Sequence, residues 1–429
     1  MIQSPPSSIR VDSHDSRCTQ SAVTVTVRRD GDWGLPGHVG VHASACVLDA
    51  ESAQEGTLKR ELQLTGGYGH DPRWLPVLQD GLRQRPLRVE ATCGGRLAGI
   101  LPLALVESRL FGRFLVSLPY VNTAGVAEVI SRGALAPGSM CDSQELGAGA
   151  RRLIDPRPPV ARALIDRAVE LADEFDVRYL ELRQETAIEH PALTFQRTDK
   201  VHMRLDLPES VEELRTALKA SVRNQIKKGE SHGLEVRWGR DDLLADFYRV
   251  FSRNMRDLGT PVFGRELFAA ILRSFGDDAE LCVVRRDVRS DRLQPVKGPA
   301  EAGHYEPVAA ALLIHAGGVT QVPSAGSLRA FNHLNANMLM YWRLLSRAVE
   351  RGSRVFDFGR SSEDSGTYRF KKQWGARPIP AVWQYYVRRG DADAMRPESA
   401  GNQRLIRLWK RLPVWLANAI GPRIVRGIP

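Results

Sequence analysis

Two stretches that lie far apart in this sequence share one pattern. Residues 168–185 read AVELADEFDVRYLELRQE, and residues 348–362 read AVERGSRVFDFGRSS. Each stretch gives the end of an amphipathic helix, a tight turn and a strand, and each strand ends in an acidic residue, an apolar residue and an arginine. An internal duplication is the simplest explanation. The chain is therefore predicted to fold as two mixed α/β units of one kind, with a boundary near residues 205–210.

The same order of elements can be followed in both halves. The first half predicts a helix, a hairpin with Gly94 and Gly95 at its turn, a strand, a second helix and a second strand, over residues 71–82, 87–108, 113–121, 159–175 and 177–183. The second half predicts two strand regions around a polar insertion at 288–306, then a helix and a strand, over residues 280–287, 307–326, 335–352 and 354–360.

These elements give four segments. Residues 1–57 are expected to be poorly structured apart from one strand within 22–29. Residues 58–207 form the first predicted domain, with a Gly-, Pro- and Ser-rich insertion at 127–159. Residues 208–390 form the second predicted domain, which carries the candidate active site. Residues 391–429 form a basic amphipathic C-terminal tail.

A single helix is predicted to link the two domains. Ser210 and Glu213 have the spacing of a capping box, and Gly229 is expected to end the helix. Its cations recur at every fourth position or close to it: Arg215, Lys219, Arg223, Lys227 and Lys228. One interpretation is a solvated helix face whose cations suit the helix C-terminus. The other is a binding surface for phosphates.

The composition limits the class of protein. The chain has 429 residues and a formal net charge of +10, which favours anionic partners such as phosphates, nucleic acid or acidic lipid. The five cysteines are scattered, so neither a disulfide scaffold nor a structural zinc site is expected. The N-terminus lacks the apolar stretch of a signal peptide, and no apolar run is long enough to span a membrane. A cytoplasmic protein is expected.

Three longer stretches make the chain recognisable: SVRNQIKKGESHGLEVRWG, FYRVFSRNMRDLGTPVF and VFDFGRSSEDSGTYRFKKQWGARP. Together with LFGRFLVSLPYVN in the first half, they resemble the FemAB-related proteins of exosortase (PEP-CTERM) and exopolysaccharide systems. These proteins belong to the wider superfamily of GNAT-like acyltransferases and Fem peptidyltransferases. The resemblance covers about residues 65–388 and implies an α/β fold of two tandem GNAT-like domains with mixed sheets.

The resemblance also implies an activity. Members of this superfamily join an acyl or aminoacyl group to an amine, and the donor is acyl-coenzyme A in one branch and aminoacyl-tRNA in the other. No tightly bound cofactor and no metal are expected. GNAT domains that bind coenzyme A usually hold its pyrophosphate on a Gly-rich loop at a helix N-terminus. Here the equivalent stretch, SLRAFNHLNANM, has no glycine, although Asn335 can still cap a helix end that faces phosphate.

Lys371 is the first candidate catalytic residue. It stands in a Y-x-F-K pattern, beginning at Tyr368, that Fem-type enzymes share, and the resemblance assigns it to the reacting carbonyl or a substrate phosphate. If the segment is extended, Lys372 points away from the site. Alternatively, both lysines are solvent-exposed beside core aromatic residues.

Other candidates surround this pattern. Arg360 ends a strand and suits bidentate binding of phosphate or carboxylate, while Asp357 is either a base or a buried partner of Arg360. The resemblance assigns three cations of the linking helix to acceptor or tRNA phosphates; two polar residues precede the helix at 335–352, and a third begins it. Together with two residues of the stretch around Lys371, the binding candidates are Arg223, Lys227, Lys228, Asn332, His333, Asn335, Tyr368 and Lys372.

The predicted function is an N-acyl or aminoacyl transferase that acts on a small-molecule or glycan amine in cell-envelope or exopolysaccharide assembly. Alternatives are an acyl-coenzyme A-dependent acetyltransferase for an amino sugar, or a non-catalytic protein that binds an anionic glycan or RNA. The C-terminal tail mixes Leu405, Leu408 and Trp415 with cations. Such a helix either packs on the second domain or contacts an anionic membrane at the inner face.

Overall fold

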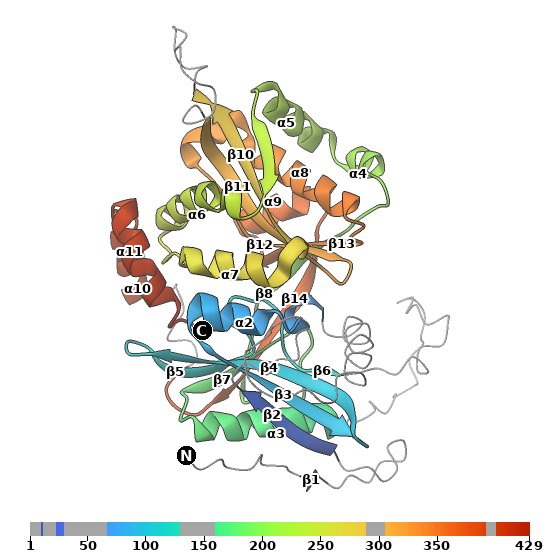
Figure 1. Ribbon diagram of the computed structural model, residues 1–429, viewed down its shortest axis with the longest axis vertical. Helices are drawn as coiled ribbons and strands as arrows, with labels where there is room; N and C mark the ends of the chain where they lie inside the picture. The colour runs from blue at the N-terminus through green and yellow to red at the C-terminus, as the bar shows by residue number, and fades with distance from the viewer. Residues whose placement is uncertain (1–9, 12–22, 30–66, 129–158, 289–304, 392–399) are drawn as a thin grey trace, which may run out of the picture.

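The computed structural model describes residues 10–11, 23–29, 67–128, 159–288, 305–391 and 400–429 (Figure 1). These residues build one mixed sheet of 14 strands, with the order β1-β2-β3-β4-β5-β7-β14-β8-β13-β12-β11-β10-β9 and with β6 paired to β4. The predicted α/β class is therefore confirmed. A single sheet runs through both halves of the molecule.

In the first half, strands precede and follow one long helix, α3 (Pro159–Glu174), along the chain. Its elements are β1 (Arg10–Val11), β2 (Val23–Arg29), the 3-10 helix η1 (Tyr68–His70), α2 (Trp74–Leu82), β3 (Arg85–Cys93), β4 (Arg96–Ser108), β5 (Gly112–Val116), β6 (Ala127–Glu128), α3 (Pro159–Glu174), β7 (Tyr179–Gln184) and β8 (Phe195–Asp206). The strand predicted within 22–29 is present as β2. The turn between β3 and β4 has positive φ at Gly94 and Gly95, as the hairpin prediction requires.

The second half repeats this plan and adds helices. Its elements are α4 (Val211–Ala217), α5 (Ala220–Ser231), β9 (Glu235–Gly239), η3 (Asp241–Leu243), α6 (Leu244–Leu258), α7 (Arg265–Phe275), η4 (Gly276–Asp278), β10 (Ala279–Asp287), β11 (Tyr305–Ala316), β12 (Val319–Ser327), η6 (Arg329–Leu334), α8 (Ala336–Glu350), β13 (Val355–Ser362), α9 (Gly366–Gln373) and β14 (Arg377–Val387). Two further helices, α10 (Ala400–Trp409) and α11 (Val414–Val425), follow.

The duplication is visible in the only parallel strand pairs that the described residues form. β5 runs parallel to β7, and Val116 lies opposite Glu181 at the last paired position. β12 runs parallel to β13, and Gln321 lies opposite Asp357 at the last paired position. In each half a helix, α3 or α8, connects the two parallel strands. Both halves thus contain the same strand–helix–strand unit.

The two halves exchange strands at the centre of the sheet. β8, from the first half, pairs with β13 of the second half, and β14, from the second half, pairs with β7 of the first half. β8 and β14 also pair with each other. The ranges of the two predicted domains remain a prediction, because each half of this sheet contains a strand from the other half of the chain.

Helices cover the sheet and join the halves. α8 buries Leu344 against one face of the second half, and α3 buries Leu164 against the first. α2 lies next to α7 between the two halves, and a Cβ atom on Gly81 would come within 2.8 Å of the Leu267 Cα atom. Only glycine permits this close approach. The helices therefore form a shared layer.

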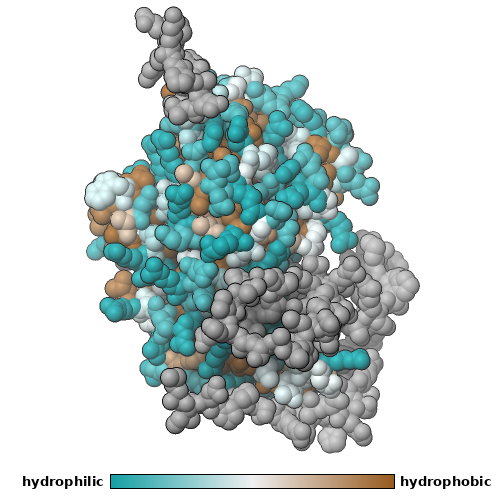
Figure 2. All heavy atoms as spheres, viewed as in Figure 1, coloured by the Kyte–Doolittle hydropathy of each residue, from teal (hydrophilic) through white to brown (hydrophobic). Residues whose placement is uncertain are grey.

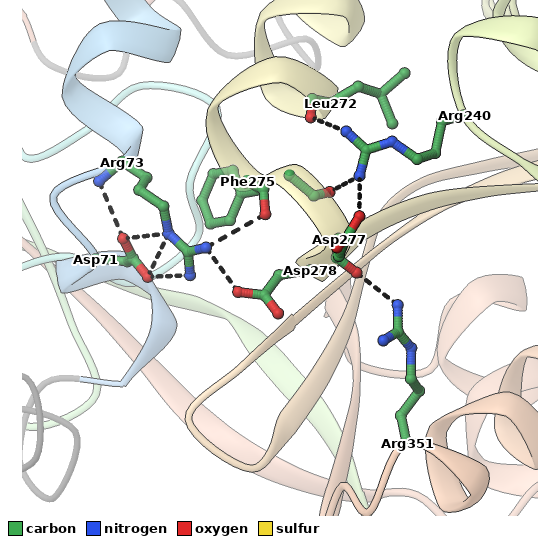
Figure 3. A network of polar contacts seen from close by, with 9 residues as sticks. Asp71, Arg73, Arg240, Leu272, Phe275, Asp277, Asp278 and Arg351 are labelled. Carbon is green, nitrogen blue, oxygen red and sulfur yellow. Dashed lines mark hydrogen bonds and ion pairs between the residues drawn. The ribbon is translucent and has the colours of Figure 1, made fainter. Parts of the chain in front are cut away.

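Ion pairs reinforce this junction (Figure 3). The Arg73 guanidinium precedes α2 and donates to Asp71 and, across the junction, to Asp278 at 2.7 Å. It also lies 4.5 Å from the ring centroid of Phe275. Arg240 donates nearby to the Leu272 carbonyl oxygen at 2.8 Å. The first half is thus anchored to the end of α7.

The predicted linking helix is wrong in its extent. Ser210 caps α4, and its hydroxyl accepts from the Glu213 amide at 3.2 Å, but the chain is extended at Leu218 and Lys219 before α5 begins. The regular row of cations is therefore broken. Gly229 lies inside α5, where a Cβ atom would meet Leu339 of α8 at 3.0 Å. Its role is close helix packing, not helix termination.

Several predictions fall on parts of the chain that are not described. These are most of residues 1–57, most of the insertions at 127–159 and 288–306, and residues 392–399 of the tail. Within the described residues, no helix is both long and apolar enough to cross a bilayer. The same residues contain no cluster of three His, Cys, Asp or Glu side chains arranged to bind a metal ion.

Candidate active site

The candidate site lies where β12 and β13 diverge. The two strands pair only as far as Gln321 and Asp357. β13 then bulges at Gly359, which has a φ of 75°, and its register against β8 shifts between Asp357 and Arg360. Bulges re-aim side chains and are common beside active sites. In the equivalent strand of the first half, β7, one residue separates Glu181 from Arg183, whereas two residues separate Asp357 from Arg360.

Asp357 anchors the bulge. Its carboxylate is 1% exposed, and Oδ1 accepts from the Gly359 amide at 2.7 Å. Oδ2 accepts from Arg204 at 3.3 Å and from Gln321 at 3.5 Å. Sequence analysis left open an ion pair between Asp357 and Arg360, but the partner is Arg204. Both carboxylate oxygens are therefore already engaged.

Arg360 has no ion-pair partner among the described residues. Its Nε donates to Asn122 Oδ1 at 3.0 Å, and its guanidinium carbon lies 3.7 Å from the ring centroid of Trp383. Burial, and next the charge of Arg183, lower the pKa of Arg360. Arg183, by contrast, pairs with Glu181 at 2.6 Å. The guanidinium of the second half is thus the one available to an anionic ligand.

Lys371 is buried on α9, so the expectation of an extended segment is wrong. Ser365 caps this helix, whose residues 366–373 include both lysines. The Lys371 Nζ donates to the carbonyl oxygens of Gly359 at 3.1 Å and Arg360 at 2.8 Å. Burial lowers the pKa of Lys371 to about 8. An ammonium has three N–H donors, so one donor remains for a ligand.

The neighbouring positions of the Y-x-F-K pattern differ from Lys371. Tyr368 is buried in the core against α8 and β13. Lys372 is exposed, and its Nζ lies 5.6 Å from the Tyr368 ring centroid. Lys371 and Lys372 are adjacent on α9, yet the ammonium of Lys371 is buried and that of Lys372 is exposed to solvent. That only one of the two lysines faces the site stays a prediction.

Three buried polar atoms beside Asp357 and Arg360 lack partners within the described residues. They are Gln321 Oε1, His202 Nδ1 and Ser361 Oγ. Buried polar atoms normally form hydrogen bonds, so this group indicates space for water or a ligand. His202 is fully buried, its Nε2 lies 3.0 Å from Thr123 Oγ1, and burial lowers its pKa to about 4. It is neutral at physiological pH.

The first half supplies the opposite wall through the loop after β5. Leu118 and Tyr120 have positive φ values of 54° and 73°, a strained conformation for such residues. The Tyr120 hydroxyl lies 2.9 Å from Ser324 Oγ of β12, and Asn122 reaches Arg360. Burial and the charge of Asp357 raise the pKa of Tyr68, which lies in the same place. The residues with strained backbone therefore lie in the loop that contacts the second half.

A pocket of about 410 Å³ lies at the amino end of α8. It is lined by residues of α5, α6, β12, η6, α8 and α9, among them Gln225, Asn254, Asn332, Asn335, Phe370 and Gln373. Asn335 has a φ of 52° and makes no side-chain capping bond, while its carbonyl oxygen accepts from the Met338 amide at 3.0 Å. The two amides of α8 before Met338 are therefore not capped by the Asn335 side chain. His333 is exposed on η6 and does not line the pocket.

The predicted cations of α5 divide into two kinds. Arg223 donates to the carbonyl oxygens of Thr216, at 3.2 Å, and of Leu218, so it caps the end of α4. Lys227 and Lys228 are exposed on the following turn. Gln225 of the same helix lines the pocket. The two lysines are therefore the available cations of this helix.

Five residues of the candidate site carry no signal of their own in the sequence: Tyr68, Asn122, His202, Arg204 and Gln321. Four of these come from the first half or from β8, and no local pattern connects them with β13. One signal was present, because the stretch LFGRFLVSLPYVN ends at Asn122.

Comparison with known proteins supports this reading of the fold. Residues 216–372 match the model of the acetyltransferase (GNAT) domain family, and this range contains β13, Lys371 and every residue that lines the pocket at α8 except Gln373. The first half repeats the parallel strand pair and connecting helix of the matched half. The fold is two tandem GNAT-like domains. No curated protein sequence matches the chain.

Solved structures resemble the two GNAT-like domains together. The FemX crystal structure is 14% identical, with a TM-score of 0.54, over 83% of this chain and 98% of FemX. L-PGS from Bacillus licheniformis is 13% identical, with a TM-score of 0.46, over 84% and 97%. A tandem GNAT protein from the clavulanic acid biosynthesis pathway is 15% identical, with a TM-score of 0.42, over 79% and 95%. At 14% identity the likeness to FemX concerns the fold alone.

Proposed function

We propose that this protein transfers an acyl or aminoacyl group to an amine acceptor and forms an amide bond. The observation that carries the proposal is the position of Lys371. Its buried ammonium has one free donor at the bulge of β13, and Phe370 and Gln373 of the same helix line the pocket at α8. One helix thus links a pocket suited to an activated donor with a cation suited to the reacting carbonyl.

The donor is proposed to bind at the amino end of α8. Open helix amides and the positive end of the helix dipole attract phosphate groups. The expected glycine is absent from this loop, but Asn335 itself adopts the positive φ that a glycine would otherwise supply. This geometry favours a phosphate-containing donor, either acyl-coenzyme A or aminoacyl-tRNA, without a tightly bound cofactor. Lys227 and Lys228 are placed to meet the longer, more charged donor.

The proposed reaction has one addition and one elimination. The acceptor nitrogen attacks the donor carbonyl carbon, a C–N bond forms and the carbonyl oxygen becomes an oxyanion. The oxyanion then collapses, the carbon–sulfur or carbon–oxygen bond of the donor breaks, and the leaving group takes up the proton that the amine gives up and departs as a thiol or hydroxyl. A preorganised cation stabilises the oxyanion more than the neutral carbonyl. We assign this role to Lys371, anion binding to Arg360, and positioning of the bulge to Asp357.

Donor binding tests the proposal directly. Isothermal titration of the full chain with acetyl-coenzyme A, with charged tRNA and with an acidic polysaccharide separates the alternatives. Heat with acetyl-coenzyme A alone supports an acetyltransferase, for which an amino sugar is the proposed acceptor. Complex formation with charged tRNA alone supports the Fem branch. Binding of neither donor, with binding of the polysaccharide, would reject the transferase and leave a glycan- or RNA-binding protein.

The proposed setting is the cytoplasm, with a role in cell-envelope or exopolysaccharide assembly. This setting is supported by the sequence resemblance to FemAB-related proteins of exosortase systems. The acceptor in such a setting is a small-molecule or glycan amine, and tRNA is the partner in the aminoacyl branch. Peripheral contact with the inner face of the membrane through the C-terminal tail is part of the same proposal.

A further inference from the structure

The C-terminal helices α10 and α11, here called the C-terminal hairpin, lie along the flank of the second half (Figure 1). The residues after α11 also contact the first half, where Gln84 donates to the Arg426 carbonyl oxygen at 3.2 Å. A Cβ atom on Gly259 would meet Ile406 of α10 at 2.6 Å, and one on Gly421 would meet the Val262 amide at 2.9 Å. The Arg256 guanidinium donates to the Leu412 carbonyl oxygen at 3.0 Å. The inward side of this hairpin is therefore fixed against α6 and the segment that follows it.

The outward side exposes large apolar residues. Leu405 is 65% exposed, Leu408 is 62% exposed and Trp415 is 70% exposed. Figure 2 shows apolar side chains mixed with hydrophilic ones on the flank that these helices form. The turn between β4 and β5 projects toward the same flank (Figure 1), and it carries Leu110, which is 76% exposed. Such a group of exposed apolar side chains marks an interaction surface.

The charge of this hairpin has one sign. Residues 400–429 contain no acidic residue, and their cations are Arg404, Arg407, Lys410, Arg411, Arg423 and Arg426. The four on α10 and the following turn are exposed. No ion pair to any of these four is formed within the described part of the chain. The surface therefore combines apolar side chains with cations that are free to meet an anionic partner.

A pocket of about 460 Å³ opens between α6 and α11. Arg249 and Arg253, one turn apart on α6, line it and are exposed, and neither makes an ion pair with another described residue. Val414 of α11 lines it next to Trp415. Asn418 also lines it, and its buried Oδ1 has no partner among the described residues. The other two charged residues of the lining, Arg256 and Glu306, form ion pairs with Asp257 and Arg286. The pocket thus offers the guanidinium groups of Arg249 and Arg253 beside the apolar flank.

We infer that the C-terminal hairpin is a docking surface for an anionic phospholipid bilayer, and that the pocket between α6 and α11 receives a phosphate headgroup. Leucine and tryptophan side chains at the outward side enter the interfacial layer, while the surrounding cations meet headgroup phosphates. A soluble anion would use the arginines but leave the apolar residues without a partner. The inference extends the peripheral contact proposed above, and it does not depend on the transfer reaction.

Co-sedimentation of the full chain with vesicles tests the inference. Equimolar phosphatidylglycerol and phosphatidylcholine vesicles should bind the protein, and added salt should weaken binding by screening. Phosphatidylcholine vesicles alone should bind far less. No binding to the anionic vesicles, or equal binding to both kinds, would overturn the inference.

Matched variants distinguish binding through this surface from a general effect of the net charge of the protein. Arg404→Gln with Arg407→Gln should lower the partition coefficient about 25-fold, since each cation near an anionic surface contributes about fivefold. Arg96→Gln with Arg162→Gln removes equal charge from exposed positions of the first half and should bind like wild type. Equal losses in the two double variants would contradict a localised surface.

Two further measurements test the apolar residues and the pocket. Trp415→Ser should reduce the binding that persists at high salt, and Arg249→Gln with Arg253→Gln should weaken binding more than the matched control. Titration with inorganic phosphate should give little heat, and strong binding of free phosphate would reassign the pocket to a soluble anion.

Sedimentation velocity tests whether a second copy of the chain, and not a bilayer, covers the hairpin surface. A wild-type dimer that becomes monomeric in Leu405→Ser with Leu408→Ser would identify the surface as a self-association interface instead. Vesicle binding requires no acyl donor. Its failure would therefore leave the transferase proposal intact, and failure of donor binding would leave this inference intact.

Discussion

Arg360 rests on Trp383, with its guanidinium carbon 3.7 Å from the ring centroid. The ring belongs to β14, the strand that the second half inserts beside β7. Arg183, the duplicated counterpart of Arg360, lies over the same ring at 4.2 Å but is neutralised by Glu181. Strand exchange therefore brings Arg183 and Arg360 to the same indole ring, and of these two only Arg360 has no ion-pair partner among the described residues.

Replacement of Lys371 should affect turnover more than binding. Lys371→Met removes the cation but keeps much of the aliphatic stem, so turnover should fall about 100- to 1,000-fold, equivalent to about 2.7 to 4 kcal/mol. Lys372→Met is the matched control and should cost little, because Lys372 is exposed. Steady-state kinetics with melting curves test this. Turnover within about threefold of wild type in a folded Lys371→Met protein would reject the assigned role.

The pH dependence of turnover should report the buried ammonium. Burial lowers the pKa of Lys371 to about 8, so the side chain is charged below that pH and loses its proton above it. Turnover that depends on the cation should therefore fall as pH rises through about 8. Lys371→Arg stays charged, because guanidinium does not lose its proton in this range. Its profile should lack the fall on the alkaline side, and an unchanged profile would count against the assignment.

Arg360 and Arg183 should respond differently to the same substitution. Arg360→Lys keeps the charge but loses the planar, bidentate donor, so affinity for an anionic substrate should fall about 10-fold or more while stability changes little. Arg183→Lys perturbs a buried pair with Glu181, so its main effect should be a lower melting temperature. Measured KM values and melting curves distinguish the two. A loss of stability alone in Arg360→Lys would show that this residue is structural.

His202 should make the fold sensitive to acid. Its pKa is lowered by burial from 6.5 to about 4, so the unfolded chain binds a proton between these values that the folded chain resists. Stability should therefore decrease as pH falls from 6.5 toward 4, by up to about 3 kcal/mol. His202→Gln should show a smaller decrease in denaturant titrations at about pH 5. The exposed His333→Gln is the control, and identical pH dependence in all three proteins would refute the prediction.

The cations of α5 should separate into a structural and a binding group. Arg223 donates to carbonyl groups at the end of α4, so Arg223→Met should lower stability by about 1 kcal/mol. Lys227→Met with Lys228→Met should leave stability unchanged and weaken donor or acceptor binding in a salt-dependent way. Calorimetric titration at two salt concentrations checks this. A double lysine variant with the same affinity and the same salt dependence as wild type would place both lysines outside the site.

The sequence predicts the elements that depend on local patterns. The repeat predicts the two strand–helix–strand units, Gly94 and Gly95 predict the β3–β4 turn, and Ser210 predicts the start of α4. No strand was assigned to residues 195–206 or 377–387, which form β8 and β14. The first is largely polar and the second contains two prolines, so neither has a simple alternation. Their partners lie in the other half of the chain, beyond the reach of local pattern.

The same limit applies to the candidate site. Arg360, Asp357 and Lys371 come from one continuous stretch, and the structure brings all three together. Asn122 and His202 meet them only because the loop after β5 and the strand β8 cross to the second half. The helical conformation of residues 366–373 was also missed. Ser365, whose hydroxyl accepts from the Tyr368 amide, is the capping signal that sequence analysis overlooked.

The position of β14 has a consequence for synthesis on the ribosome. The place between β7 and β8 is filled by residues 377–387, which are translated long after both of these strands. Until then the nascent first half has an unpaired edge at β7, and such edges favour association with other chains. The first half can therefore complete its strand pairing only after residues 377–387 have been translated. The addition of β14, the last of the described strands to be translated, completes the strand pairing of β7 and β8 together.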